Sequence, residues 1–263
     1  MTKSSISLLA IVLNEEEDLP GLLASCYWVD ELVIIDGGST DKTVGIAKNA
    51  GARVITRKFD DFGSQRKFAL EQACTEWVLM LDADERPSRV LIDEIKKIIG
   101  REDAADVYRI PIETEFWGRC LKHVWNGPPM VRLFRKKAVS APDSSVHESM
   151  VARGVVASIP RGIILHKTYK SVFEHLKKIN LYTQLSLESD VNEWRSRGRM
   201  RWYQIIGIPI INFCWRYLIR LGFMDGLPGL VMCLQVGYIS FVRLIKVYER
   251  IYLNAPASNY SEE

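Results

Sequence analysis

The sequence lacks any cysteine pattern. Five cysteines are scattered over 263 residues, and no two of them form a Cys-x-x-Cys pair. An odd number of separated thiols is typical of a protein in a reducing compartment, so neither a disulfide framework nor a cysteine-based zinc site is expected. The first apolar run has only eight residues and is followed by three glutamates, so no secretory signal peptide is predicted.

The sequence also lacks a strong excess of charge of one sign. Its 35 basic and 32 acidic residues give a net charge of +3, which is too small to indicate nucleic acid as a partner. The chain is 48% hydrophobic, so it can bury a full core and is long enough for one large domain with an appendage.

Polar side chains follow three apolar runs, residues 6–13, 33–35 and 79–81, at the points where strands would end. The residues that follow them are Asn14, Asp36 and Asp82. Helical stretches at 19–27, 42–49, 64–74 and 88–99 alternate with strand-like runs, which predicts βαβ units and a parallel sheet. The carboxyl edge of such a sheet is where open α/β folds bind ligands.

Asp82 and Asp84 lie one residue apart at the end of the third run. At a strand end the two carboxylates can diverge onto different parts of one ligand. A hard divalent cation prefers carboxylate oxygens and keeps positions open for phosphate oxygens, so the pair predicts a metal-diphosphate site. A solvated turn after a buried strand is the alternative interpretation.

Four motifs together resemble the inverting family 2 glycosyltransferases with the GT-A fold. They are Asn14-Glu15-Glu16, the 36–41 segment that begins Asp36-Gly37-Gly38, the 63–67 segment and Asp82-Ala83-Asp84-Glu85. The resemblance covers roughly the first 170 residues. Within the family, the 59–63, 77–79 and 146–148 segments and the apolar C-terminal third are most similar to the short bacterial glucosyltransferases that build the lipopolysaccharide inner core.

The resemblance implies an α/β fold class and a two-part organisation. Residues 1–170 are expected to form a Rossmann-like, nucleotide-sugar-binding GT-A domain with a mostly parallel sheet. Within it, residues 1–105 form the nucleotide-sugar half and residues 106–170 the acceptor half. Residues 171–263 are expected to form a helical, membrane-associating region.

The resemblance also implies roles for the donor-site residues. Asp36 would bind the nucleotide base, Asp82 the ribose or sugar hydroxyls, and Asp84 a Mg²⁺ or Mn²⁺ ion. Asn14 and Glu16 would line the uracil-ribose side. For Asn14, a capping box with the glutamate three residues on is the alternative.

Arg66 offers a fork of donors to phosphate oxygens from the start of a predicted helix, and an ion pair with Glu71 or Asp61 is the alternative for it. Arg132 and Arg135 could reach phosphate groups on the acceptor or be exposed to solvent.

The general base is expected in the 146–148 segment. Glu148 is the preferred candidate, because a glutamate in a partly desolvated pocket has a raised pKa and can accept the proton. His147 could orient it or act itself, and Asp143 and Glu113 are the alternatives. His166 follows a strand-like run and could complete the metal site or have a structural role.

The C-terminal third combines basic, aromatic and aliphatic residues. Between Trp194 and Met224 the sequence has no acidic residue and six arginines, at positions 195, 197, 199, 201, 216 and 220. This composition predicts an interfacial segment on an anionic membrane surface. The 227–242 stretch would span roughly 24 Å as a helix, short of the roughly 30 Å hydrocarbon core, so it is expected to lie in the interface. The alternative is that this stretch packs in a helical core, either within one chain or between copies of it. A homo-oligomer is therefore one of the predicted partners.

These expectations combine into one function. The chain is predicted to be a metal-dependent, inverting glycosyltransferase, cytoplasmic and peripheral on a bacterial inner membrane. It would use a nucleotide sugar, UDP-glucose, and a lipid-linked saccharide acceptor such as the lipopolysaccharide inner core. A polyprenyl phosphate or peptide acceptor is the alternative within the fold, and a nucleotide-binding membrane scaffold is the alternative outside enzymes.

Overall fold

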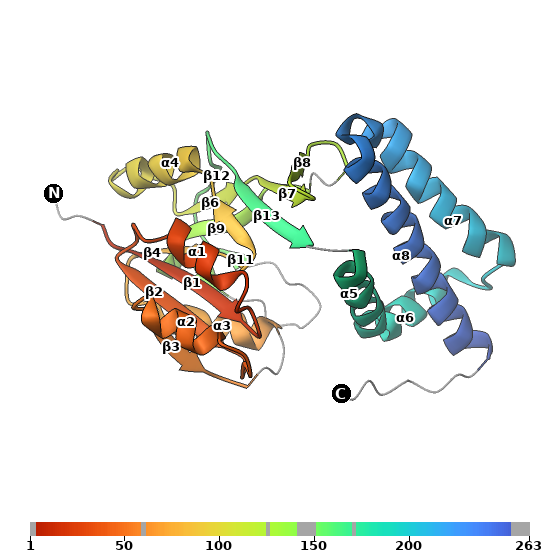
Figure 1. The fold of residues 1–263 in the computed structure, drawn as a ribbon, viewed down its shortest axis with the longest axis horizontal. Helices are drawn as coiled ribbons and strands as arrows, with labels where there is room; N and C mark the ends of the chain where they lie inside the picture. Colours follow the sequence, from red (N-terminus) through yellow and green to blue (C-terminus); the bar gives the residue numbers. More distant parts are fainter. Residues whose placement is uncertain (1–3, 59–61, 125–126, 141–150, 170–171, 254–263) are drawn as a thin grey trace. The chain divides into compact units, whose positions relative to one another are not determined.

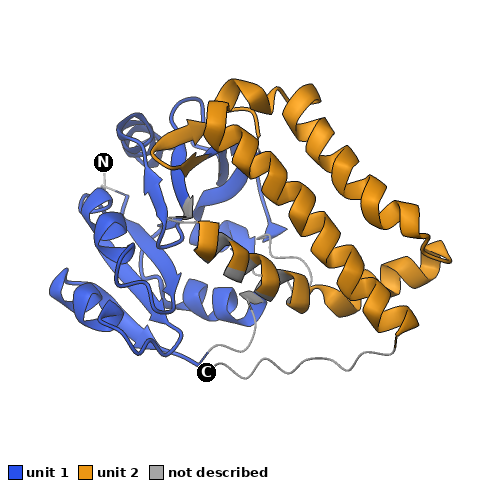
Figure 2. Cartoon of the chain, turned by 45° about the vertical axis from the view of Figure 1, so that its right-hand side comes forward, with its two compact units in different colours: residues 1–113, 127–167 blue, residues 114–126, 168–263 orange. Residues whose placement is uncertain are grey.

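The computed structural model describes residues 4–58, 62–124, 127–140, 151–169 and 172–253. The chain forms two compact units (Figure 2). The first contains residues 1–113 and 127–167, and the second contains residues 114–126 and 168–263. Each unit has hydrophobic clusters of its own.

The first unit is built on a seven-stranded sheet with the strand order β12-β6-β9-β4-β1-β2-β3 (Figure 1). Strands β4, β1, β2 and β3 run parallel, and β9 is antiparallel to both of its neighbours, β4 and β6. The strands are β1 (Ile6–Val12), β2 (Glu31–Asp36), β3 (Arg53–Thr56), β4 (Trp77–Met80), β6 (Val107–Ile110), β9 (Met130–Arg135) and β12 (Val156–Ser158). The mostly parallel sheet confirms the predicted α/β, GT-A fold class.

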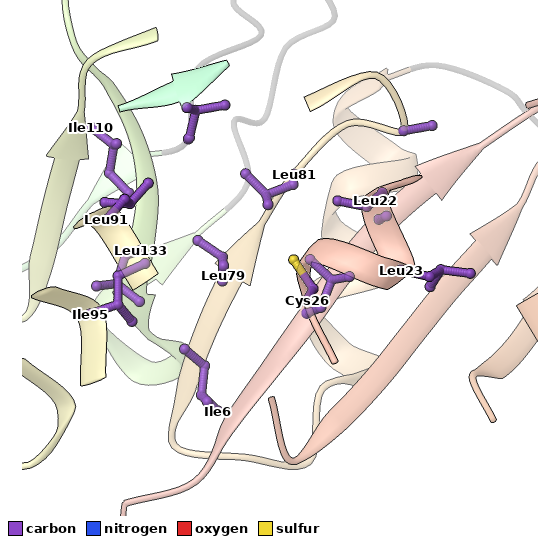
Figure 3. Close-up of a cluster of buried hydrophobic side chains, with 14 of the residues drawn as sticks. Ile6, Leu22, Leu23, Cys26, Leu79, Leu81, Leu91, Ile95, Ile110 and Leu133 are labelled. Carbon is purple, nitrogen blue, oxygen red and sulfur yellow. The ribbon is translucent and has the colours of Figure 1, made fainter. Parts of the chain in front are cut away.

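Helices cover both faces of this sheet, because alternate residues of each strand point to opposite sides. Leu8 packs with α1 (Leu19–Ser25), α2 (Thr43–Asn49) and α4 (Arg89–Ile99) in one cluster, part of which Figure 3 shows. Leu9 packs with α3 (Phe62–Gln72) in the other cluster. The four helices match the predicted helical stretches to within two residues, and Ser88 caps α4 by accepting a hydrogen bond from the Leu91 N–H at 3.2 Å.

Short strands complete the first unit near the end of β4. Strand β5 (Glu85–Pro87) pairs antiparallel with β13 (Ile164–Tyr169), and the register places His166 opposite Glu85. Strands β10 (Val139–Ser140) and β11 (Val151–Ala152) form a separate pair after a 3-10 turn at Lys136–Ala138. The β5–β13 pairing therefore brings a histidine from late in the sequence to the acidic motif.

The second unit is mainly helical, which confirms the predicted helical C-terminal region. It contains α5 (Val172–Leu185), α6 (Leu187–Arg197), α7 (Trp202–Cys214) and α8 (Gly226–Tyr252), with a π-helical turn at Trp215–Ile219 and a 3-10 turn at Gly222–Asp225. The hairpin of β7 (Ile112–Phe116) and β8 (Arg119–Leu121) precedes it in the sequence. Helices α7 and α8 pack closely at Gly237, where a Cβ atom would lie only 3.2 Å from the Pro209 carbonyl oxygen.

Helix α8 is longer than the sequence predicted. Its 27 residues continue ten residues past the 227–242 apolar stretch and span about 40 Å. Residues 222–252 are long and apolar enough to cross a membrane, by length and composition alone. The predicted length of roughly 24 Å therefore describes only the apolar stretch, because the helix continues through polar residues beyond it, and the interfacial position of this segment stays a prediction.

Asp225 holds the 122–124 segment in the second unit. Its carboxylate accepts hydrogen bonds from the backbone N–H groups of Lys122, His123 and Val124 at 2.9–3.1 Å. The His123 Nδ1 atom lies 2.8 Å from the same carboxylate. Burial raises the pKa of Asp225, but these hydrogen bonds outweigh it, so the pKa lies below its usual range.

Candidate functional site

The acidic motif forms a tight turn at the carboxyl end of β4. The Asp82 backbone N–H donates to Glu85 Oε2 at 3.0 Å, and the Glu85 N–H donates to the Asp82 carbonyl oxygen at 3.0 Å. The turn separates the side chains: Asp82 is 51% exposed, Asp84 is 18% exposed and Glu85 is buried. The two aspartates face different surroundings, as expected at a strand end.

Arg132 on β9 bridges two of these carboxylates. Its Nη2 atom lies 2.9 Å from Asp82 Oδ2 and 2.6 Å from Glu85 Oε1. Burial raises the pKa of Glu85 to about 7, although Arg132 opposes this rise. Burial also acts to raise the pKa of Asp82, but Arg132 and then Arg66 outweigh it and hold that pKa below its usual range.

This role for Arg132 was missed by sequence reasoning, which expected Arg132 to reach phosphate groups on the acceptor or to be exposed to solvent. The available signal was its position beside Phe134 on the same face of an apolar strand, where an arginine needs a buried carboxylate partner. Arg135 is also engaged within the protein. It pairs with Glu76, lies 3.7 Å from Asp106 and stacks over the Trp77 ring at 4.6 Å.

Asp84 and His166, the two predicted metal ligands, are in contact with each other. His166 Nε2 lies 3.1 Å from Asp84 Oδ2, and the Lys167 N–H donates to the Asp84 carbonyl oxygen at 2.9 Å. Burial lowers the pKa of His166, but the Asp84 carboxylate outweighs this and raises it above its usual value.

The Asp84 carboxylate suits Mg²⁺ or Mn²⁺, and the neutral imidazole of His166 suits a transition metal such as Mn²⁺ better than Mg²⁺; the two side chains leave the other coordination positions to a ligand. In the ranges that the structure describes, no three His, Cys, Asp or Glu side chains gather as a complete metal cluster. The pair therefore fits a cation that is shared with bound phosphate oxygens.

Asp36 lies buried at the end of β2, one strand beyond β1 from the acidic turn. Its carboxylate accepts hydrogen bonds from the backbone N–H groups of Gly38 and Ser39, both at 3.1 Å. Gly38 has a φ of +105°, which favours glycine there and allows the chain to turn directly after the strand. The carboxylate thus shapes the loop in which it sits.

Asn14 and Glu16 connect the ends of β1 and β2. Asn14 Oδ1 accepts from the Thr40 N–H at 2.8 Å, and Glu16 Oε2 accepts from the Lys42 N–H at 3.0 Å. The alternative of a capping box starting at Asn14 is wrong, because Asp18 occupies the N-cap of α1. Both side chains order the loop that follows Asp36, and their contact with a nucleotide stays a prediction.

Arg66 lies half-buried on α3 and is close enough to Asp82 to lower the pKa of that carboxyl group. The preceding residue anchors the helix, because the Gln65 side chain exchanges hydrogen bonds with Arg57 at 2.6 and 3.1 Å. The structure thus brings Arg66 near the acidic turn, where an anion could use its charge.

One of the four candidates for the general base lies in the part of the chain that the structure describes. Glu148, His147 and Asp143 lie outside the residues that the structure describes. Glu113 is half-buried on β7. The assignment of the base to Glu148 therefore stays a prediction.

The residues at the carboxyl edge of the sheet can together bind an anionic ligand that also carries hydroxyl groups. Asp82 is exposed and can accept from hydroxyls, Asp84 and His166 can hold a cation, and Arg66 adds positive charge. A nucleoside diphosphate linked to a sugar has this combination of groups.

The chain is similar to known glycosyltransferases. The model of "Glycosyl transferase family 2" matches residues 7–159. The lipopolysaccharide core biosynthesis glycosyltransferase LpsC of Rhizobium meliloti is 28% identical over 260 residues, which cover 96% of this chain and 95% of LpsC. An uncharacterized glycosyltransferase of Rickettsia typhi is 30% identical over 258 residues, covering 93% and 87% of the two chains. Among solved structures, S. aureus TarS 1–349 in complex with UDP has a TM-score of 0.47 and 16% identity, with 94% and 91% coverage.

Proposed function

Because the chain belongs to glycosyl transferase family 2, we propose that it moves glucose from UDP-glucose to a lipid-linked saccharide such as the lipopolysaccharide inner core. Glycosyltransferase activity follows from the family. The choice of acceptor is supported by LpsC, which is named for lipopolysaccharide core biosynthesis and resembles this chain over nearly its whole length.

The contact between Asp84 and His166 carries the proposal. In this interpretation the two side chains hold Mg²⁺ or Mn²⁺, which when bound neutralises charge on the leaving diphosphate. His166 must be neutral to bind a cation, so the ion would replace the proton that Asp84 now favours. His166 of β13 lies beside Asp84, the residue before β5, because these two strands pair.

The other residues of the edge would bind the rest of the donor. Arg132 holds Asp82 Oδ2, which fixes the carboxylate while leaving it half exposed to accept ribose or sugar hydroxyls. Arg66 would bind phosphate oxygens, and Asp36, with the loop ordered by Asn14 and Glu16, would bind the uracil side. Glu148, oriented by His147, would remove the proton of the acceptor hydroxyl. The acceptor oxygen would bond to the sugar carbon as the bond from that carbon to the UDP oxygen breaks, so UDP leaves and the configuration is inverted.

The second unit would place the enzyme on the cytoplasmic face of the inner membrane as a peripheral protein. Helix α7 exposes Trp202, Ile206, Ile210 and Ile211, and α8 exposes Leu227 among others. Large exposed apolar side chains beside arginines are what an interface with anionic lipids requires. Carbonate extraction of membranes separates this arrangement from insertion of α8 across the bilayer, because only a peripheral protein is released.

The experiment that tests the function uses purified full-length protein with a panel of radiolabelled nucleotide sugars and Mn²⁺. Lipid A core, a polyprenyl phosphate and a peptide are offered as acceptors in parallel. We expect transfer from UDP-glucose to the lipid A core and no transfer with excess EDTA or in Asp84→Ala. Transfer to another acceptor replaces the proposed substrate, and nucleotide binding without release of sugar favours the scaffold.

A further inference from the structure

A cavity of about 740 Å³ lies in the second unit, where the start of α7 meets the end of α8. Its walls include Arg199, Arg201, Trp202, Tyr203 and Tyr252. None of these residues belongs to the acidic turn of the first unit or to the proposed donor site. The cavity is therefore a separate feature that the proposed reaction does not use.

The cavity has a strongly positive lining. Three arginines, Arg197, Arg199 and Arg201, contribute to it, and no acidic side chain is among its described lining residues. Arg197 is already paired with Glu193 on its own helix. Across the described ranges, neither Arg199 nor Arg201 forms an ion pair with a carboxylate, so their charges are available to an anion.

The wall of the cavity is ordered by hydrogen bonds and ring contacts. The Met200 N–H donates to the Tyr252 hydroxyl at 2.8 Å, which ties the segment between α6 and α7 to the end of α8. The Tyr248 and Tyr252 rings lie 4.8 Å apart, and Arg201 Nη1 donates to the Tyr203 hydroxyl at 3.1 Å. The arginines thus sit on a built surface of aromatic rings rather than on a free tail.

The surroundings of the cavity indicate where its ligand comes from. Helix α7 begins at the cavity with Trp202, which is 73% exposed, and continues with exposed Ile206, Ile210 and Ile211. Arginine, tryptophan and tyrosine at one end of an apolar helix face are typical of the headgroup level of a membrane. A lipid with its chains along the face of α7 would present its headgroup to the cavity.

We propose that this cavity binds the phosphate-bearing headgroup of a single anionic membrane lipid, with Arg199 and Arg201 as the anion ligands. This inference rests on the membrane association in the proposed function and makes it specific. If lipid binding depended on diffuse electrostatic attraction, all surface arginines would contribute about equally. If the lipid binds in the cavity, the arginines that line the cavity contribute more than the others. Arg195 provides the matched control, because it is an exposed arginine of α6 that does not line the cavity.

The test is calorimetric titration of the full-length protein with monomeric dihexanoylphosphatidylglycerol. We expect saturable binding of one lipid per chain, weakened about tenfold or more in Arg199→Gln, as for loss of a hydrogen bond to a charged group. Arg195→Gln should change the affinity by less than about twofold, as for an exposed charge. Circular dichroism of both variants checks that the helices remain folded.

Three results would overturn the proposal. Equal losses in the two variants mean diffuse attraction, and absence of saturable binding means that there is no headgroup site. Inorganic phosphate that binds as tightly as the lipid means a site for free anions. Flotation of the wild-type protein with phosphatidylglycerol vesicles separates the failure of the headgroup site from the failure of membrane association. If the protein floats but shows no saturable binding, the proposed membrane association stands and the headgroup site in the cavity is refuted.

Discussion

Replacing Arg132 with methionine should destabilise the first unit in a way that depends on pH. Arg132 is the cation that lies between Asp82 and Glu85, at 2.9 and 2.6 Å. Methionine fills much of the same space and leaves Glu85, which is 1% exposed, without its counter-charge. Removing one partner of a buried ion pair costs about 3–5 kcal/mol when the remaining charge cannot escape.

Glu85 can lose its charge by binding a proton, and this makes the destabilisation by Arg132→Met depend on pH. Its pKa in the folded protein is about 7, above the ordinary 4.5, so its stabilising effect is complete below pH 4.5 and is lost as the pH rises to 7. Without Arg132 the folded pKa rises further, and the variant continues to lose stability above pH 7 by up to about 1.4 kcal/mol per pH unit. The difference from wild type should therefore be larger at pH 8.5 than at pH 6.

Urea unfolding followed by tryptophan fluorescence measures this difference at the two pH values. Adding Glu85→Gln to Arg132→Met should remove most of the pH dependence, because the buried carboxyl group with the raised pKa is then absent. Arg109→Met is the control, since Arg109 is exposed on the neighbouring strand β6. If Arg132→Met matches the control, or if its effect is the same at both pH values, the buried bridge does not have the role assigned to it.

Three further predictions concern the proposed active site and the second unit. Asp84→Ala should reduce transfer by several orders of magnitude while the protein stays folded, and activity that survives in excess EDTA contradicts the metal role. Glu148→Gln should abolish kcat with little change in donor affinity, whereas the same result in Asp143→Asn would move the base there. Asp225→Asn should lower the free energy of unfolding by about 1.5–3 kcal/mol, because three backbone donors and His123 lose a charged acceptor. Since the folded pKa of Asp225 lies below 3.8, this stabilisation exists above pH 3.8 and should disappear as the pH falls through the folded value, which acid unfolding of both proteins measures.

The sequence was sufficient to predict the sheet edge and its helices. Apolar runs that end in Asn14, Asp36 and Asp82 became β1, β2 and β4, and Ser88 marked the start of α4. These features depend on local patterns, in which side-chain periodicity and helix capping are visible in short segments. The Asp84–His166 pair was also anticipated, although only the antiparallel pairing of β5 with β13 brings the two together.

Features that depend on long-range packing could not be predicted in this way. The bridge from Arg132 to Glu85 joins residues 47 positions apart. The local sequence of the 130–135 segment does not indicate which carboxylate Arg132 contacts. Asn14 had a plausible local partner for a capping box, but its side chain instead accepts a hydrogen bond from a residue 26 positions away. The attachment of His123 to Asp225 spans 102 positions and likewise required the structure.

The measurement that tests the central claim most directly is the affinity for UDP as Mn²⁺ is added, in the wild-type protein and in His166→Ala. The account predicts that Mn²⁺ raises the affinity of the wild-type protein by about tenfold or more, since a cation shared between Asp84, His166 and the diphosphate adds at least about 1.4 kcal/mol. His166→Ala should lose most of this gain, and His123→Gln, a histidine variant of the second unit, should keep it. Equal UDP affinity in Mn²⁺ and in EDTA would contradict the assignment of the metal to this site.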